Sequence, residues 1–321
     1  MGYQVEAEEP DLALEAEGLA VEPITQWDLF SARLRRHRLA MVAAGILAGL
    51  VMLVVAAPWL PLHDPTERLV DEAGRSLVNI APRQGLWLGT DDLGRDVLSR
   101  VIYGGRASLI VGVTAGILVA LLGTLIGSLA GYYPGLPDQA LMRFTDLVLG
   151  LPLLPVAIVV GRILPEIPFL PEWLKQGPFG IALLLGFLSW GSLARIVRAE
   201  FLSLREKEFV EAARAAGASD RRIVFRHILP NAMSPIIVTT TLVVGSAIII
   251  EAALSFLGFG VRPPTPTWGA MVAQGGRLAV RGFWWSLVFP GIALVVTVLS
   301  INFLGDGLRD ALDPTQTIER K

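Results

Sequence analysis

Six stretches of this chain contain no Asp, Glu, Lys or Arg and are long enough, or nearly long enough, to cross a membrane. They are residues 39–63, 107–137, 147–161, 176–194, 227–250 and 282–305. A helix that crosses the hydrocarbon core needs about 20 largely apolar residues. The third stretch is the shortest and contains Pro152 and Pro155, so we expect it to reach spanning length by running from Phe144 to Leu164. The pattern predicts an all-α integral membrane protein with six transmembrane helices.

Composition agrees with a membrane protein and excludes several other classes. Hydrophobic residues make up 53% of the chain and charged residues 17%, against about 25% charged residues in an average soluble protein. There is no cysteine, which excludes disulfides, cysteine nucleophiles and thiolate metal sites. The net charge of -2 gives no basic field for a nucleic acid. The lipid bilayer is therefore the predicted environment, and no nucleic-acid partner is expected.

Arginine and lysine predict the orientation of the helices. Four arginines lie between residues 33 and 38, and eight Lys or Arg residues lie between 195 and 226. With six spans these two segments lie on the same side of the membrane. Segments rich in Lys and Arg remain cytoplasmic, so both termini are predicted to be cytoplasmic.

Small residues in the second span predict close helix packing. Gly112 and Gly116 are four residues apart, and Gly123, Gly127 and Gly131 continue at the same spacing. Glycines at this spacing lie on one face of a helix and allow a neighbouring backbone to approach.

Two predicted external connections carry further signals. In residues 62–106 we expect Thr90 or Asp91 to cap a short amphipathic helix that begins near Asp92. The connection between spans five and six is rich in proline and glycine, which predicts a rigid external loop. Trp268 in that loop is expected to lie at the membrane interface.

Residues 208–231 predict a helical hairpin outside the membrane. Residues 208–216 are good helix formers, and Gly217 suits a left-handed helix C-terminus. Ser219 is expected to cap a second helix, and Pro230 is expected to end it before span five. Such a hairpin presents a face of small alanines that fits a groove on another protein.

The hairpin sequence resembles the EAA loop of ABC importer permeases. The matching residues are Glu211-Ala-Ala, Gly217 six residues after Glu211, and His227-x-Leu-Pro-Asn. Further stretches resemble the C-type transmembrane subunit of the dipeptide/oligopeptide/nickel permease family; they are residues 88–96, 252–258, 263–269 and 305–314. The resemblance extends from about the first span to Pro314. Nickel and glutathione importers share much of this pattern, so the transported ligand does not follow from it.

This resemblance implies a fold, partners and site residues. The fold would be the six-helix type I ABC importer permease fold, with the hairpin as a coupling helix. In that family the hairpin docks on a nucleotide-binding subunit, and the residues implied here are Glu211, Ala212, Ala213, Gly217 and Ala218, supported by His227, Pro230 and Asn231. The implied partners are a homologous B-type permease subunit, two ATP-binding subunits and an extracytoplasmic substrate-binding protein. ATP and Mg would be bound by the partner subunits, with no cofactor in this chain, in the plasma (inner) membrane of a bacterium or archaeon.

The same reading divides the chain into four parts. They are an acidic cytoplasmic tail (1–28), an N-terminal segment with the first span and an external loop (29–104), the permease core (105–312, with the EAA loop at about 201–231) and a cytoplasmic tail (313–321). Residues 1–28 carry eight acids and no Lys or Arg, a composition typical of a disordered segment.

Two questions remain open at the level of sequence. Glu251 ends an apolar span, where a gating role and a structural hydrogen bond to the external loop are both consistent with its position.

The second open question is the energy source. None of the three lysines precedes Ser or Thr, so there is no phosphate-binding Gly-x-x-x-x-Gly-Lys-Ser/Thr loop. A secondary transporter is the main rival, but it would need an ionisable relay inside the bundle, and the spans almost lack charge. An intramembrane enzyme is a weaker rival, because neither His-Glu-x-x-His nor Gly-x-Ser-x-Gly occurs.

Overall fold

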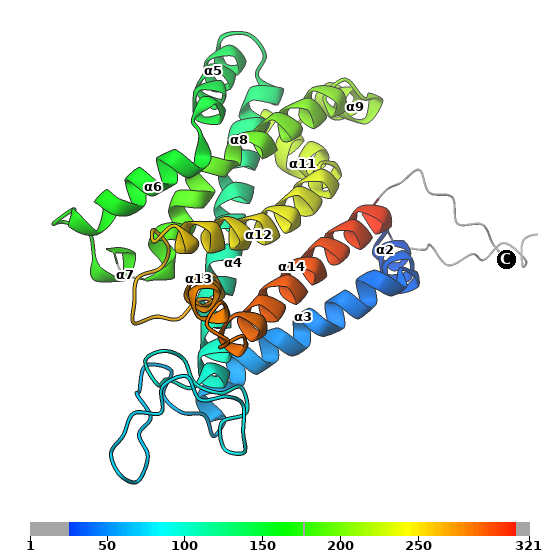
Figure 1. The fold of residues 1–321 in the computed structure, drawn as a ribbon. Helices are drawn as coiled ribbons and strands as arrows, with labels where there is room; N and C mark the ends of the chain where they lie inside the picture. The colour runs from blue at the N-terminus through cyan, green and yellow to red at the C-terminus, as the bar shows by residue number, and fades with distance from the viewer. Residues whose placement is uncertain (1–25, 176, 313–321) are drawn as a thin grey trace, which may run out of the picture.

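Long helices dominate the computed structural model of this chain, which describes residues 26–175 and 177–312 (Figure 1). Residues 1–25 of the predicted acidic tail and all of the predicted C-terminal tail lie outside the described residues. Five helices are long and apolar enough to cross a membrane. They are α3 (Arg38–Ala56), α4 (Val97–Tyr132), α8 (Pro178–Leu204), α12 (Met233–Phe256) and α14 (Trp285–Leu312). Five of the six predicted spans are thereby confirmed.

The predicted third span is not one straight helix. The structure has α5 (Leu136–Gly150) and α6 (Leu153–Ile163), with a bend of 83° at the break between them. The expectation of one continuous helix from Phe144 to Leu164 is therefore wrong. Leu151 at the break is extended, with φ -73° and ψ 128°, because a residue before proline avoids the helical region. The described residues contain six spans only if this bent pair is one of them.

Shorter elements precede or connect the spans. They are α2 (Gln26–Arg36), η1 (Ala57–Trp59), η2 (Leu164–Glu166), α7 (Glu172–Lys175), α9 (Glu208–Ala215), α10 (Asp220–Arg222), the π-helical turn η3 (Ile223–Ile228), α11 (Leu229–Asn231) and α13 (Trp268–Ala279). The predicted external loop between spans five and six thus contains a helix of 12 residues, α13.

Helix α4 is the centre of the bundle, and its glycines are the contact points that the sequence predicted. A Cβ on Gly127 would lie 2.5 Å from the backbone oxygen of Ala194 in α8. A Cβ on Gly112 would lie 2.8 Å from Ile248 Cγ1 in α12. Because only glycine permits these approaches, α4 packs directly against both neighbouring helices.

The two ends of α4 carry different structures (Figure 1). The connection from η1 to α4 lies at the N-terminal end of α4, together with α13. The hairpin that begins with α9 lies near the C-terminal end of α4. With 36 residues, α4 is about 54 Å long, which exceeds the hydrocarbon core of about 30 Å. The loop and the hairpin are therefore separated by more than a membrane thickness.

Candidate functional site

The hairpin predicted from the sequence is present as a chain of short helices. Helix α9 ends at Ala215, and Gly217 follows with φ +80°. The amide of Gly217 donates to the Arg214 carbonyl, and the amide of Ala218 donates to the Ala213 carbonyl, both at 3.0 Å. These two bonds form a Schellman C-terminus. The prediction of a left-handed glycine at this break is confirmed.

The inner face of the hairpin packs onto the bundle. Val210, Ile223 and Ile228 are fully buried in one cluster with Val197 and Phe201 of α8. Two of the predicted docking residues, Ala213 and Ala218, are partly buried against the same cluster. These two alanines therefore contribute to the packing of the hairpin against the bundle as well as to its exposed surface.

The outer face of the hairpin is exposed in the described structure. Glu211, Ala212 and Gly217 all lie on it. Two aromatic rings share this surface, since Phe209 is 40% exposed and Phe225 is 63% exposed. Exposed aromatic residues are typical anchors of protein interfaces. Sequence reasoning did not single them out, although large apolar residues in an otherwise charged segment are a signal that could have done so.

The second half of the hairpin differs from its predicted form. Ser219 precedes α10, but its side chain makes no capping hydrogen bond. The helical path continues through the π-helical turn η3 into α11, where Pro230 lies in the first turn. This second helix ends at Asn231, one residue after Pro230, and a turn at Ala232 separates it from α12.

The predicted loop-support residues are brought together at this turn. The side-chain amide of Asn231 donates to the backbone oxygen of His227 at 2.6 Å. Pro230 lies between them in the chain and is exposed. The three residues thus form the junction between the hairpin and α12.

Glu251 lies at the other end of α12 and is fully buried. Its Oε1 accepts hydrogen bonds from Ser255 at 2.7 Å and from Thr267 at 3.0 Å. Thr267 also caps α13 by accepting from the Ala270 amide. The hydrogen bond to the external connection, one of the two alternatives considered from the sequence, is therefore present. A gating role for Glu251 stays a hypothesis.

Trp268 does not lie at a membrane interface. Its side chain is 1% exposed, and its indole Nε1 donates to the Val101 carbonyl at 2.8 Å. Its backbone amide donates to Ser108 Oγ at 3.1 Å. The prediction was wrong because the ring fills the space between α13 and α4.

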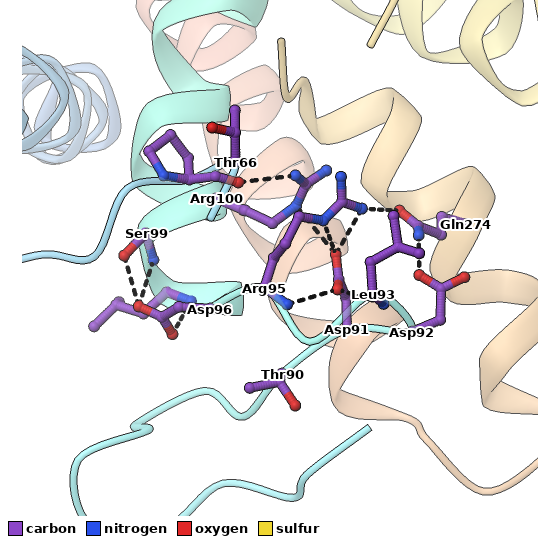
Figure 2. Close-up of polar contacts among 12 residues, drawn as sticks. Thr66, Thr90, Asp91, Asp92, Leu93, Arg95, Asp96, Ser99, Arg100 and Gln274 are labelled. Carbon is purple, nitrogen blue, oxygen red and sulfur yellow. Dashed lines mark hydrogen bonds and ion pairs between the residues drawn. The ribbon is translucent and has the colours of Figure 1, made fainter. Parts of the chain in front are cut away.

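A polar cluster joins the loop between η1 and α4 to α4 itself and to α13 (Figure 2). Asp91 Oδ1 accepts from the amides of Leu93 and Arg95, and its Oδ2 accepts from Arg95 Nε at 2.8 Å. Arg100 of α4 also pairs with Asp91. Gln274 of α13 donates to Asp92 and accepts from Arg95. The cluster fixes the loop against both helices.

The predicted short helix near Asp92 is absent from this loop. Helix α4 begins at Val97, and Asp96 caps it by accepting from the amides of Leu98 and Ser99. Asp91 instead forms a tight turn.

The same turn occurs earlier in the loop, around Asp71, whose carboxylate accepts from the amides of Ala73 and Arg75. The bond from the Arg75 amide holds the pKa of the Asp71 carboxyl below its ordinary value. The first turn is exposed and the second is buried against the helices, so the same local chemistry works in two environments.

Comparison with known proteins places this architecture in a family. Residues 123–318 match the family described as binding-protein-dependent transport system inner membrane component. Residues 25–82 match the N-terminal TM domain of oligopeptide transport permease C.

Individual relatives cover nearly the whole chain. The oligopeptide transport system permease protein OppC of Bacillus subtilis is 37% identical over 300 residues, which is 94% of this chain and 93% of the relative. The glutathione transport system permease protein GsiD of Escherichia coli is 41% identical over 290 residues, which is 90% of this chain and 91% of the relative. A protein of Brucella abortus that carries a provisional name as a peptide transport system permease is 42% identical over 291 residues, covering 91% of this chain and 93% of the relative.

A solved structure shares the fold. A chain of the MetNI methionine ABC transporter, in an inward-facing conformation, superposes with a TM-score of 0.54 over 67% of this chain and 96% of that chain, at 19% identity. At this identity the likeness speaks for the fold alone, and it agrees with the type I permease architecture. The matches along the sequence show that this multi-pass membrane protein belongs to the family of binding-protein-dependent transport system inner membrane components. Within that family it is a permease subunit of an ABC importer of the peptide-transport type and not an enzyme.

Proposed function

We propose that this chain forms half of a translocation pathway for di- and oligopeptides and is coupled to ATPase subunits through the hairpin of residues 208–231. The observation that carries the proposal is that one side of this hairpin is buried against the bundle and the other side is exposed. Val210, Ile223 and Ile228 are fully buried on the inner side, whereas Glu211 and Ala212 are exposed on the outer side. A segment held on one side and open on the other can transmit force from a partner to the bundle.

The proposed docking surface consists of the exposed hairpin residues. Glu211, Ala212 and Gly217 lie within it, and Ala213 and Ala218 contribute their exposed parts. Small side chains allow a partner groove to approach the backbone. His227, Pro230 and Asn231 support this surface through the Asn231–His227 hydrogen bond.

The complete importer would contain further subunits. We propose a homologous B-type permease that forms the other half of the pathway, two ATP-binding subunits that hold ATP and Mg, and an extracytoplasmic binding protein that delivers the peptide. Both termini of this chain would lie on the cytoplasmic side of a bacterial or archaeal plasma membrane. ATP binding drives the bundle only if the ATPase subunits bind one of its conformations more tightly than the other.

Reconstitution tests this function directly. Proteoliposomes that contain both permeases, with and without the ATPase subunits, are assayed for uptake of a labelled peptide delivered by the binding protein. We expect uptake to require the ATPase subunits and internal ATP. Uptake driven by an ion gradient without ATPase subunits would show a secondary transporter and refute the proposal.

The peptide class is tested separately. The purified binding protein is titrated with a dipeptide, an oligopeptide, glutathione and nickel ion by calorimetry. We expect tight binding of the dipeptide or the oligopeptide. Tight binding of nickel ion alone, or of glutathione alone, would contradict the proposed substrates, although it would leave the ATP-driven mechanism intact.

A further inference from the structure

The hydroxyl group of Tyr132 links the end of α4 to Asp220, at the start of the second arm of the hairpin. Tyr132 is the last residue of α4 and is 8% exposed. Its hydroxyl donates to Asp220 Oδ1 at 2.7 Å, and Asp220 is the first residue of α10. One buried side chain at the end of α4 therefore contacts the start of the second arm of the hairpin.

Neighbouring residues hold this contact in place. Tyr133 packs edge-on against the Tyr132 ring, with ring centroids 4.9 Å apart, and its hydroxyl lies 3.4 Å from Asp220 Oδ2. That distance is long for a bond between two oxygen atoms, so Tyr132 provides the stronger contact. Arg205, which follows α8, donates to the backbone oxygen of Tyr132 at 3.3 Å.

The other contacts of the hairpin with the bundle have a different character. Val210, Ile223 and Ile228 pack against Val197 and Phe201. Burial of apolar surface is non-directional, so these contacts hold the hairpin against the bundle without joining one defined pair of atoms. A hydrogen bond requires a defined distance and direction. The Tyr132–Asp220 bond is therefore suited to set the angle between the hairpin and α4.

Helix α4 can transmit a displacement of the hairpin to α8 and α12. A Cβ on Gly131 would lie 2.7 Å from the Arg198 carbonyl of α8, and one on Gly116 would lie 2.6 Å from Val244 Cγ2 of α12. Contacts this close leave little room for α4 to move without its neighbours.

We propose that Tyr132 and Asp220 are positioning residues that hold the hairpin at a fixed angle to α4, so that movement of the hairpin moves the bundle. The inference rests on the proposed coupling function of the hairpin. It adds to that function the point at which force passes from the hairpin into α4.

The test uses the full complex with both ATPase subunits and the binding protein. For each variant, peptide uptake per ATP hydrolysed is measured, together with the amount of ATPase that co-purifies. Tyr132→Phe keeps the ring in its cluster but removes the hydroxyl, so we expect normal co-purification and at least a fivefold loss of uptake per ATP. Asp220→Ala is expected to give the same loss. Asp220→Asn keeps an acceptor oxygen and is expected to retain most of the coupling.

A double-mutant comparison and a matched control complete the test. Because the two side chains act through one bond, Tyr132→Phe combined with Asp220→Ala is expected to be no worse than either single variant. Tyr133→Phe removes the weaker neighbouring hydroxyl and is expected to stay within twofold of the unaltered protein. Asp220 is exposed, so its variants report on coupling even where Tyr132→Phe lowers the yield of complex.

Two results would overturn the inference. One is an uptake per ATP within twofold of normal for both Tyr132→Phe and Asp220→Ala. The other is a double variant whose loss is the product of the two single losses. Failure of the proposed coupling function has a different signature, because Glu211→Lys would then retain full ATPase association. If only the present inference fails, Glu211→Lys still weakens co-purification of the ATPase subunits, whereas Tyr132→Phe keeps a normal peptide uptake per ATP hydrolysed.

Discussion

Replacing Gly127 by alanine tests the contact on which the bundle is centred. The added Cβ would lie 2.5 Å from the backbone oxygen of Ala194 and 2.7 Å from Val197 Cβ. Neither atom is the end of a flexible side chain, so α4 and α8 must separate. Forcing extra atoms into a packed interior typically costs about 1–3 kcal/mol, and we expect the unfolding free energy of Gly127→Ala to fall by this amount.

Two comparisons isolate the cause. Gly49 in α3 has no atom within 4 Å of the added Cβ, so Gly49→Ala makes the same chemical change in a membrane helix without a clash. The difference between the two variants therefore reports packing and not helix propensity. At Gly123 the nearest atoms belong to the Leu193 side chain, at 2.8–3.0 Å. Gly123→Ala should cost less, because none of these atoms belongs to the backbone, and Leu193→Ala should relieve it only in part, because alanine keeps the Cβ that lies 2.8 Å away.

The assay is unfolding of the purified permease complex in mixed micelles with increasing SDS, followed by tryptophan fluorescence. We expect Gly49→Ala to be the most stable of the three variants, Gly123→Ala to be intermediate and Gly127→Ala to be the least stable. Equal stability of the Gly49 and Gly127 variants would refute the packing argument, since it would mean that α4 and α8 are not in the described contact.

Three further predictions concern orientation, a buried acid and the external loop. A cysteine introduced at Ser219 should react with an impermeant maleimide only from the cytoplasmic side, and one at Ala73 only from outside; the reverse pattern would invert the orientation. Glu251→Gln should lower peptide uptake by less than tenfold, because the amide oxygen can still accept the two hydroxyl hydrogen bonds; complete loss in an assembled complex would show that its charge is required. Asp91→Ala should destabilise the complex by about 1–3 kcal/mol, because buried donors lose their acceptor, whereas Asp71→Ala in the exposed copy of the turn should have a smaller effect in the same unfolding assay; equal losses would contradict the role of burial.

Local sequence signals predicted the features that depend on local physics. The charge-free stretches gave five of the long helices, because a run of apolar residues has few alternatives to a membrane helix. Gly217 was correctly placed at the helix break, because glycine adopts a positive φ readily. The glycines of α4 were correctly assigned to helix contacts, although the sequence did not say which helices they meet.

Features that depend on distant partners could not be predicted. Thr90, Asp91 and Asp96 are all able to cap a helix, but the Thr90 hydroxyl bonds to the backbone of Leu77 and Ile80 and Asp91 pairs with Arg100, which leaves the capping role to Asp96. Trp268 was placed at an interface because its ring is amphipathic, but its partner is Val101, which lies 167 residues away in the chain.

The same limit applies to the hairpin. The exposed positions of Phe209 and Phe225 depend on which face of the hairpin meets α8. The hydrogen bond from Tyr132 to Asp220 joins residues 88 positions apart. The sequence pattern identified the hairpin that we propose as the docking segment, and the structure was needed to show how this hairpin is held against the bundle.

The central claim is that the hairpin couples this permease to ATP hydrolysis, and one measurement tests it most directly. Ligand-stimulated ATPase activity is measured in complexes that carry Glu211→Lys or Gly217→Val. A Cβ at Gly217 meets no atom within 4 Å, so placing one there costs backbone strain of about 1 kcal/mol, and the β-branched valine costs more. Gly282→Val is the matched control, because Gly282 also has a positive φ and open space but lies between α13 and α14.

The account predicts that both hairpin variants remain in the membrane and lose ligand-stimulated ATP hydrolysis, at least tenfold, while Gly282→Val does not. The basal activity of the isolated ATPase subunits is unchanged, because their active site lies outside this chain. Full ligand-stimulated hydrolysis and full ATPase association in both hairpin variants would contradict the account.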